Sequence, residues 1–196
     1  MEYSEKYKNY QLNRSWLRKV IRKIYLSHTS KFVIGKAVDF GCGVGELLDF
    51  LPDGSIGLEI NRHAVEYCQE NNKNVEFYNL TDAYMFHNLE RGQYNTFIIN
   101  HVLEHIEDAD QALKLIAKNI SDMGIRRIIL VVPGKKGFLY DKSHITYIDD
   151  RYITKKKLSN ISGFKITTLR WFPINWKFIE KYFTHHEMMV IYDYKT

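Results

Sequence analysis

Three glycines alternate with other residues near the start of the chain, in a pattern suited to binding a ligand. The stretch reads Val38-Asp39-Phe40-Gly41-Cys42-Gly43-Val44-Gly45-Glu46 and directly follows a short apolar run. Glycine lets a backbone turn sharply and approach a ligand closely. A strand that runs through such a turn into a helix also presents unpaired N–H groups to a ligand. The pattern predicts a ligand-binding loop, with a purely structural turn as the alternative.

The spacing within this loop favours a cationic ligand over a phosphate. A dinucleotide-binding loop has the form Gly-x-Gly-x-x-Gly. Here Gly45 comes one residue early, and Glu46 occupies the position of the third glycine. The carboxylate of Asp39, two residues before Gly41, also suits a positively charged ligand. A nicotinamide-dependent oxidoreductase is therefore a weaker interpretation of the loop.

Two histidines follow a second apolar run, in Asn100-His101-Val102-Leu103-Glu104-His105, and a third, His144, lies in Lys142-Ser143-His144-Ile145-Thr146-Tyr147. Histidine titrates near neutral pH and is suited to accept a proton during catalysis. His101 and His144 are the candidate catalytic bases. His105, with Glu104, is a candidate for holding its loop together by hydrogen bonds. A structural role is the alternative for each histidine, and their spacing matches no metal-binding motif, so no metal site is predicted.

Two acidic residues follow neighbouring predicted strands. Glu59 ends the second strand about 20 residues beyond the start of the glycine loop, where βαβ nucleoside sites place a carboxylate for the ribose hydroxyls. Thr81 and Asp82 follow the third strand. They are candidates for ligand contact, and equally for capping a helix.

Strands and helices are predicted to alternate along most of the chain, which indicates a mainly parallel sheet covered on both faces. A helix over about 13–28 comes first. The predicted strands are residues 37–40, 56–60, 75–79, 95–100 and 127–132, and the predicted helices are residues 44–51, 61–69 and 109–120. Residues 164–170 and 187–193 then form two consecutive strands around an aromatic insert, residues 172–185. Two consecutive strands suggest an antiparallel edge pair.

Composition limits the class of protein. Hydrophobic residues make up 45% of the chain and charged residues 26%, as in globular domains. Cys42 and Cys68 are too few for a disulfide framework, and we expect a reducing, cytoplasmic setting. No signal peptide or membrane span is predicted. A net charge of +5 is compatible with a nucleic-acid partner, although a lysine-rich solvated surface is the simpler explanation.

The motif Asp39-x-Gly41-x-Gly43-x-Gly45 resembles the first motif of class I S-adenosylmethionine-dependent methyltransferases. Val102-Leu103-Glu104-His105 resembles the segment after the fourth strand in the branch of that family that modifies small molecules, such as quinone, sugar and natural-product precursors. The resemblance covers roughly residues 35–170. It implies a Rossmann-like three-layer sandwich whose seven-stranded sheet carries an antiparallel strand, in a single domain over residues 1–196. The cofactor core would span about 35–135 and the substrate side about 136–196.

The resemblance also implies S-adenosylmethionine as cofactor and assigns its contacts. Those positions are Asp39, Gly41, Cys42, Gly43, Gly45, Glu59, Ile60, Thr81, Asp82, Asn100, His101 and Val102. In the family an acidic residue at the place of Asp82 commonly bonds the adenine amino group. The N-terminal helix often closes over the cofactor, which makes Tyr10, Asn13 and Arg14 further candidates. Tyr147 and Trp176 are candidate substrate contacts, the latter in the aromatic insert, where we expect substrate choice to reside.

The implied activity is methyl transfer to a small molecule, with an acceptor hydroxyl and a histidine base as the expected chemistry. The Asn/Asp-Pro-Pro-aromatic motif of enzymes that methylate exocyclic amines of bases is missing at Asn100-His101-Val102-Leu103. The basic charge keeps an RNA or protein methyltransferase as an alternative. The short chain keeps a non-catalytic protein that binds S-adenosylmethionine as another. The oligomeric state stays open.

Overall fold

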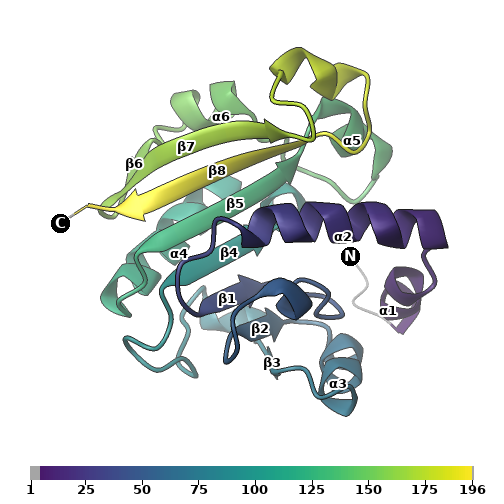
Figure 1. Cartoon of the computed structure of the whole chain (residues 1–196). Coiled ribbons are helices and arrows are strands. Elements are labelled where there is room, and N and C mark those ends of the chain that lie inside the picture. Colours follow the sequence, from purple (N-terminus) through teal and green to yellow (C-terminus); the bar gives the residue numbers. More distant parts are fainter. Residues whose placement is uncertain (1–4, 196) are drawn as a thin grey trace.

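The structure, a computed structural model, describes residues 5–195, without the side chains of Lys6, Tyr7, Tyr10 and Leu80. Its described strands form one sheet in the order β3-β2-β1-β4-β5-β8-β7-β6 (Figure 1). Five are parallel to one another: β1 (Ala37–Phe40), β2 (Ile56–Glu59), β3 (Val75–Phe77), β4 (Thr96–Asn100) and β5 (Arg127–Pro133). Each of the last three pairs antiparallel with its neighbours in the sheet: β6 (Asn160–Ile161), β7 (Phe164–Phe172) and β8 (Glu187–Tyr194). The chain therefore has the predicted α/β fold.

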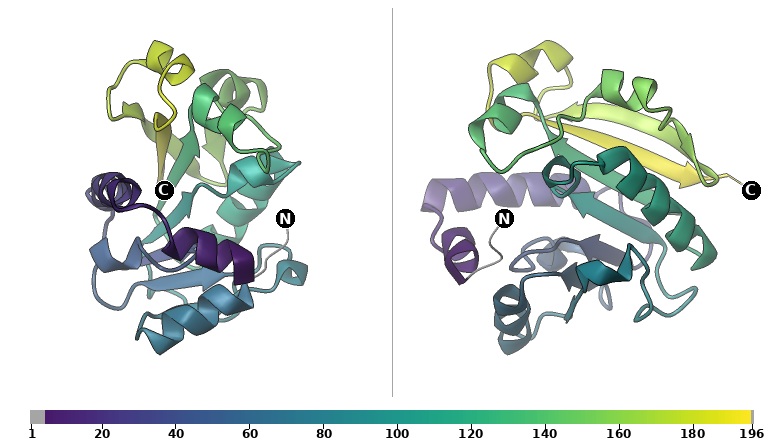
Figure 2. Two further views of the ribbon diagram at one scale, coloured as in Figure 1. Left: turned by 90° about the vertical axis from the view of Figure 1, so that its right-hand side faces the viewer. Right: turned by 180° about the vertical axis from the view of Figure 1, so that it is seen from behind.

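Helices cover both faces of this sheet, which makes three layers. They are α1 (Glu5–Leu12), α2 (Trp16–Ser30), α3 (Arg62–Glu70), α4 (Ala109–Asp122), α5 (Lys135–Tyr140) and α6 (Asp150–Lys155). Viewed from opposite sides, α2 lies over one face of the central strands and α4 over the other (Figures 1 and 2). Among the described helices, none has the length and apolar character needed to cross a bilayer.

The core is divided by the sheet, because successive side chains of a strand point to opposite faces. In β4, Phe97 and Ile99 join a buried cluster with Leu113 of α4. Ile98, between them, packs in a separate cluster with Leu26 of α2. The long apolar runs of the sequence thus reflect strands that are buried on both faces.

The helix predicted over residues 44–51 is wrong, since only a short 3₁₀ turn, η1 (Leu48–Phe50), forms there. Gly45 has a φ of +69°, which a right-handed helix does not allow. The Gly45 carbonyl accepts a hydrogen bond from Lys73 Nζ at 2.8 Å, and the Val44 N–H donates to the buried Gln11 side chain at 3.2 Å. The side chain of Lys73 therefore takes the Gly45 carbonyl, which a helix would have paired with a backbone N–H four residues on.

The antiparallel edge has one strand more than predicted. Ser162 and Gly163, with φ of +47° and +86°, form a tight turn that pairs the two-residue β6 with the start of β7. Positive φ at both central residues is the geometry of a two-residue hairpin turn. The aromatic insert leaves the sheet between β7 and β8 and contains the 3₁₀ segment η4 (Lys177–Lys181). Neither α1 nor α5 was expected, whereas α2 lies where the N-terminal helix was predicted.

Candidate functional site

A cleft of about 310 Å³ opens at the carboxyl ends of the central strands. Its floor is made by the glycine loop and the end of β4, and its walls by α1, α2, α5 and the segment leading into β8. The residues that line it are Gln11, Arg14, Arg18, Ile21, Arg22, Tyr25, Gly41, Cys42, Gly43, Asn100, His101, His105, Pro133, Gly137, Tyr140, Asp141, His144, Thr184, His185, His186 and Glu187. Ligands of open α/β sheets bind at this end of the strands.

The glycine loop needs its glycines for both backbone shape and space. Gly41 and Gly43 have φ of +75° and +58°, in the left-handed region that glycine favours. A Cβ on Gly41 would lie 2.5 Å from the side chain of Val102, and one on Gly43 would lie 2.7 Å from the side-chain oxygen of Gln11. The loop is thus held between the turn after β4 and helix α1, with its backbone open to the cleft.

Glu59 holds this loop in place. Its buried carboxylate accepts hydrogen bonds from the backbone N–H groups of Gly43 at 2.7 Å, Ile60 at 2.9 Å and Asn61 at 2.9 Å. Burial raises the pKa of the carboxyl in spite of these three donors. A carboxylate offers about four acceptor positions, and these bonds use three of them. Asn61 caps α3 by accepting from the His63 N–H at 3.1 Å.

A second buried acid lies beside the loop. Asp39 is 2% exposed, and burial raises the pKa of its carboxyl to about 7, against the lowering effect of the Arg22 charge. The Arg22 guanidinium itself is bonded to Glu46, which also accepts from Arg14 at 2.7 Å. The loop therefore lacks an α-helix N-terminus and has acids around it. It is unsuited to a pyrophosphate and suited to the ammonium and sulfonium of S-adenosylmethionine.

His101 bridges two acids from opposite sides of the cleft. Its Nδ1 lies 3.0 Å from Glu104 Oε1 and its Nε2 lies 2.9 Å from Glu187 Oε1. Burial disfavours the charged ring, but the charges and hydrogen bonds of the two acids outweigh it and raise the pKa of His101 to about 10. Both ring nitrogens then donate, and the backbone holds the ring there with a φ of +57°. His101 is thus placed to fasten β4 to β8.

His105 and His144 face each other across the cleft wall, with ring centroids 4.8 Å apart. His105 Nδ1 lies 3.2 Å from the carbonyl of Ser143, which confirms that this histidine holds its loop to a neighbouring one. His144 Nδ1 lies 3.0 Å from the carbonyl of Phe138 and must donate to it, so Nε2 carries the lone pair. Burial lowers the pKa of His144, and that hydrogen bond offsets the effect only in part.

The structure brings some of the predicted site residues together and not others. Gly41, Cys42, Gly43, Asn100, His101 and His144 line the cleft. Asp39 and Glu59 are buried beside it. The carbonyl of Gly45 is bonded to Lys73, and Val102 packs on Gly41. The N–H of half-buried Ile60 donates to Glu59. Thr81 and Asp82 lie in a 3₁₀ turn capped by Asn79, not in the cleft lining.

The two candidate substrate residues lie outside the lining of the cleft. The Tyr147 hydroxyl donates to buried Glu180 at 2.7 Å, and Trp176 is 62% exposed. Of the N-terminal candidates, Arg14 lines the cleft, Asn13 is exposed, and the Tyr10 side chain lies outside the described part.

Sequence reasoning missed Gln11, Arg22 and Glu187. Each reaches the site from an element far along the chain from the loop it contacts, and none has a local pattern that marks it. The sequence marked Glu187 only as the first residue of a predicted strand, which gave no indication of a contact with His101. Cys42 and Cys68 are both buried and free.

Comparison with known proteins agrees with this geometry. Residues 38–125 match the sequence model of a family described as a methyltransferase domain. A comparison with curated protein sequences found no match.

Solved structures of methyltransferases share the fold. Magnesium protoporphyrin IX methyltransferase from Synechocystis, with bound SAH, is similar at a TM-score of 0.62 and 19% identity, over 93% of this chain and 89% of that one. A SAM-dependent methyltransferase from Archaeoglobus fulgidus has a TM-score of 0.63 and 16% identity, over 90% and 93% of the two chains. A small RNA methyltransferase has a TM-score of 0.60 and 16% identity, over 91% of this chain and 25% of that one.

Proposed function

We propose that the chain is a class I S-adenosylmethionine-dependent methyltransferase, because residues 38–125 match a methyltransferase-domain family and the fold is shared with such enzymes, and that it methylates a small molecule on a hydroxyl oxygen. The observation that carries this proposal is the size of the cleft. Its volume of about 310 Å³ is at the lower end of small-molecule sites. Residues of α1 and α2 and the segment Thr184–Glu187 line it. A compact acceptor fits this space better than a polymer does.

The residues around the glycine loop are assigned to the cofactor. When bound, S-adenosylmethionine supplies an electrophilic methyl group. Asp39 would pair with its ammonium, and the fourth acceptor position of Glu59 would take a ribose hydroxyl. Thr81 and Asp82 would meet the adenine end, as in the family that the sequence resembles. The backbone of Gly41 and Gly43 would lie against the ligand, since no side chain intervenes.

The acceptor is assigned to the side of the cleft that carries the histidines. Because both nitrogens of His101 donate to acids, this ring orients Glu187 and the end of β4 and has no lone pair for a proton. His144 keeps a lone pair on Nε2 and lines the cleft. Of the two predicted bases, it is the one placed to take the hydroxyl proton of the acceptor.

An RNA acceptor is the second candidate. The net charge of +5 and the arginines of α2 that line the cleft, Arg18 and Arg22, favour it. Binding through phosphates would weaken steeply with salt, by roughly tenfold or more between 50 and 200 mM for several contacts.

To test this, the protein is incubated with a cell extract and methyl-labelled S-adenosylmethionine, and the products that carry the label are identified. Ultrafiltration then separates methylated small molecules from methylated RNA and protein. We expect the label in the small-molecule fraction, resistant to the acid and base that release methyl groups from carboxyls, as an ether is. Label retained with RNA, together with salt-sensitive RNA binding, would replace the proposal with the second candidate. Label on neither, with S-adenosylhomocysteine bound normally, would refute both.

A further inference from the structure

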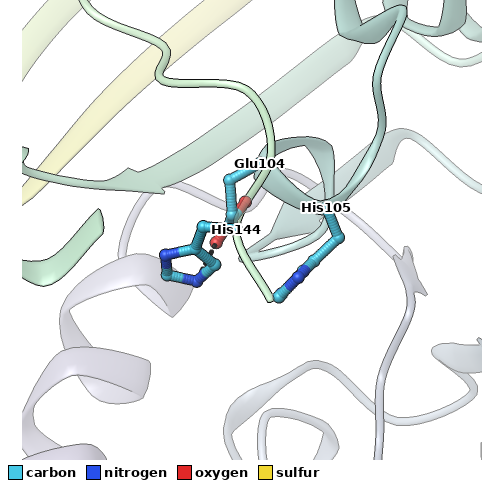
Figure 3. Close-up of side chains that lie close together, drawn as sticks. All are labelled: Glu104, His105 and His144. Carbon is cyan, nitrogen blue, oxygen red and sulfur yellow. Dashed lines mark ion pairs between the residues drawn. The ribbon is translucent and has the colours of Figure 1, made fainter. Parts of the chain in front are cut away.

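Three side chains with metal-binding atoms meet at the edge of the cleft. Glu104 and His105 belong to the 3₁₀ turn η3 (Leu103–His105) after β4, and His144 belongs to the loop between α5 and α6 (Figure 3). One ligand atom from each lies within 4.8 Å of the others. Donors about 2.1 Å from a tetrahedral ion lie roughly 3.4 Å apart. Small side-chain rotations would close this group around an ion.

A buried oxygen without a partner points to a missing ligand. The Glu104 side chain is 1% exposed, and its Oε1 contacts His101 Nδ1 at 3.0 Å. Its Oε2 is buried and has no hydrogen-bond partner among the residues that the structure describes. Leaving a buried carboxylate oxygen unpaired is unfavourable, and native structures rarely do so. A cation beside Oε2 would satisfy it.

Both histidines are oriented as metal ligands are. A ligating imidazole typically uses one nitrogen for the metal and donates the other N–H to a carbonyl or carboxylate, which fixes the ring. His105 has its Nδ1 on the Ser143 carbonyl and His144 has its Nδ1 on the Phe138 carbonyl, at 3.2 and 3.0 Å. Among the described residues no hydrogen bond is found to Nε2 of either ring, and that of His144 lies 3.9 Å from both Glu104 Oε1 and Asp141 Oδ2.

The backbone holds the two contributing segments together before any ion binds. The carbonyl of Glu104 accepts from the N–H groups of Ile145 at 2.7 Å and Thr146 at 3.0 Å. The Thr146 hydroxyl donates to the carbonyl of Ile106 at 2.7 Å. The group is therefore preorganised, with its separation set by main-chain contacts rather than by flexible side chains.

We propose that Glu104, His105 and His144 form a binding site for a divalent transition-metal ion of the Zn²⁺, Fe²⁺ or Mn²⁺ class. Two imidazoles and one carboxylate suit these ions better than Ca²⁺ or Mg²⁺, which prefer oxygen ligands throughout. Three protein ligands leave coordination positions open. Because His105 and His144 line the cleft, these positions face the space assigned to the acceptor.

The role of the ion rests on the proposed function. A hydroxyl bound to the ion would have a lowered pKa and would release its proton to water. His144 would then hold the ion instead of accepting that proton. The sequence shows no metal motif because Glu104 and His144 are separated by α4, β5 and α5.

The test measures metal binding directly. The full chain is stripped with a chelator and titrated with Co²⁺, followed by visible absorption, and with Zn²⁺, followed by calorimetry. We expect one ion per chain and at least a tenfold loss of affinity in His105→Ala and in His144→Ala. His87→Ala, which changes an exposed histidine away from the cluster, is the matched control and should bind as the parent does. Normal S-adenosylhomocysteine binding by each variant confirms that it is folded.

The outcomes separate this inference from the proposed function. No stoichiometric ion, or equal affinity in the parent and both cluster variants, overturns the metal site, whatever the acceptor. Glu104→Gln keeps the size of the side chain and serves as a second variant if an alanine variant does not fold. Stoichiometric binding that the cluster variants lose upholds the site even if no small-molecule acceptor is methylated. Methylation by the metal-free chain at the full rate refutes the role of the ion in activating the acceptor.

Discussion

The raised pKa of Asp39 predicts that cofactor affinity depends on pH. Below pH 7 the carboxyl is mostly neutral, because burial raises its pKa to about 7. To pair with the ammonium of a ligand it must first lose its proton. Each pH unit below that pKa therefore weakens binding by about tenfold, or about 1.4 kcal/mol. Between pH 7.5 and pH 5.5 the expected loss is roughly 25-fold.

The assay is calorimetric titration with S-adenosylhomocysteine, which carries the ammonium group and is not consumed. Methylthioadenosine is the matched control ligand, since it shares the adenosine and lacks the ammonium. Its affinity should change little over the same range. A pH effect acting through Glu59, which would reach both ligands, is thereby separated from one acting through Asp39.

The variant Asp39→Asn keeps the shape of the side chain and cannot ionise. It should bind S-adenosylhomocysteine more weakly at pH 7.5 and lose the pH dependence. The reasoning is refuted if the parent shows no slope, or if the variant keeps it.

The same shift has a consequence for stability, in the opposite direction. In the unfolded chain the Asp39 carboxyl ionises near its ordinary value of 3.8, whereas in the fold it ionises near 7. The contribution of Asp39 to folding stability is therefore highest in acid and falls as the pH rises from about 4 to 7, by roughly 4 kcal/mol in total. Thermal melts of the parent and of Asp39→Asn should diverge over that range, with the variant the more stable above pH 7. Parallel curves would contradict the assignment.

Three further substitutions test the packing of the site. Glu59→Gln replaces one of the two oxygens that accept from three backbone N–H groups. It should lower the free energy of unfolding, measured by denaturant titration, by about 2–4 kcal/mol. The control Glu90→Gln changes an exposed acid and should leave the free energy of unfolding unchanged. Gly41→Ala should weaken S-adenosylhomocysteine binding by at least about tenfold, because its Cβ would lie 2.5 Å from a valine side chain at a φ of +75°; unchanged affinity in calorimetry would show that the loop is not the ligand floor. Tyr147→Phe leaves buried Glu180 without its hydroxyl donor and should lower the free energy of unfolding by about 1–3 kcal/mol without changing cofactor affinity. A variant that loses methyl transfer but keeps its stability would instead support contact between Tyr147 and the substrate.

The fold could be predicted because its determinants are local. Apolar runs such as Arg127–Pro133 are buried on both faces, and the glycine turn follows directly from the end of β1. Strand and turn preferences act over a few residues. The same locality explains why a helix could be predicted after β2 and the last two long strands as an antiparallel pair.

The site depended on contacts that no local pattern contains. His101 was recognisable as a histidine at a strand end, and by itself it suggested a base. Only the tertiary structure placed Glu187, 86 residues away, on its second ring nitrogen. The helix after the glycine loop was predicted from local preference, whereas in the fold Gly45 has a φ of +69° and its carbonyl is bonded to the distant Lys73.

The sequence by itself determined which segments form the five parallel strands and the two long antiparallel strands, and that the glycine loop follows the first of them. The tertiary structure decided which nitrogen and oxygen atoms remain available there. Hydrogen bonds between separate segments join Gly43 to Glu59 and His101 to Glu187, and Glu104 Oε2 has no partner among the described residues. Availability of such atoms depends on every neighbour in space, whereas a strand or turn depends mainly on its neighbours in the chain.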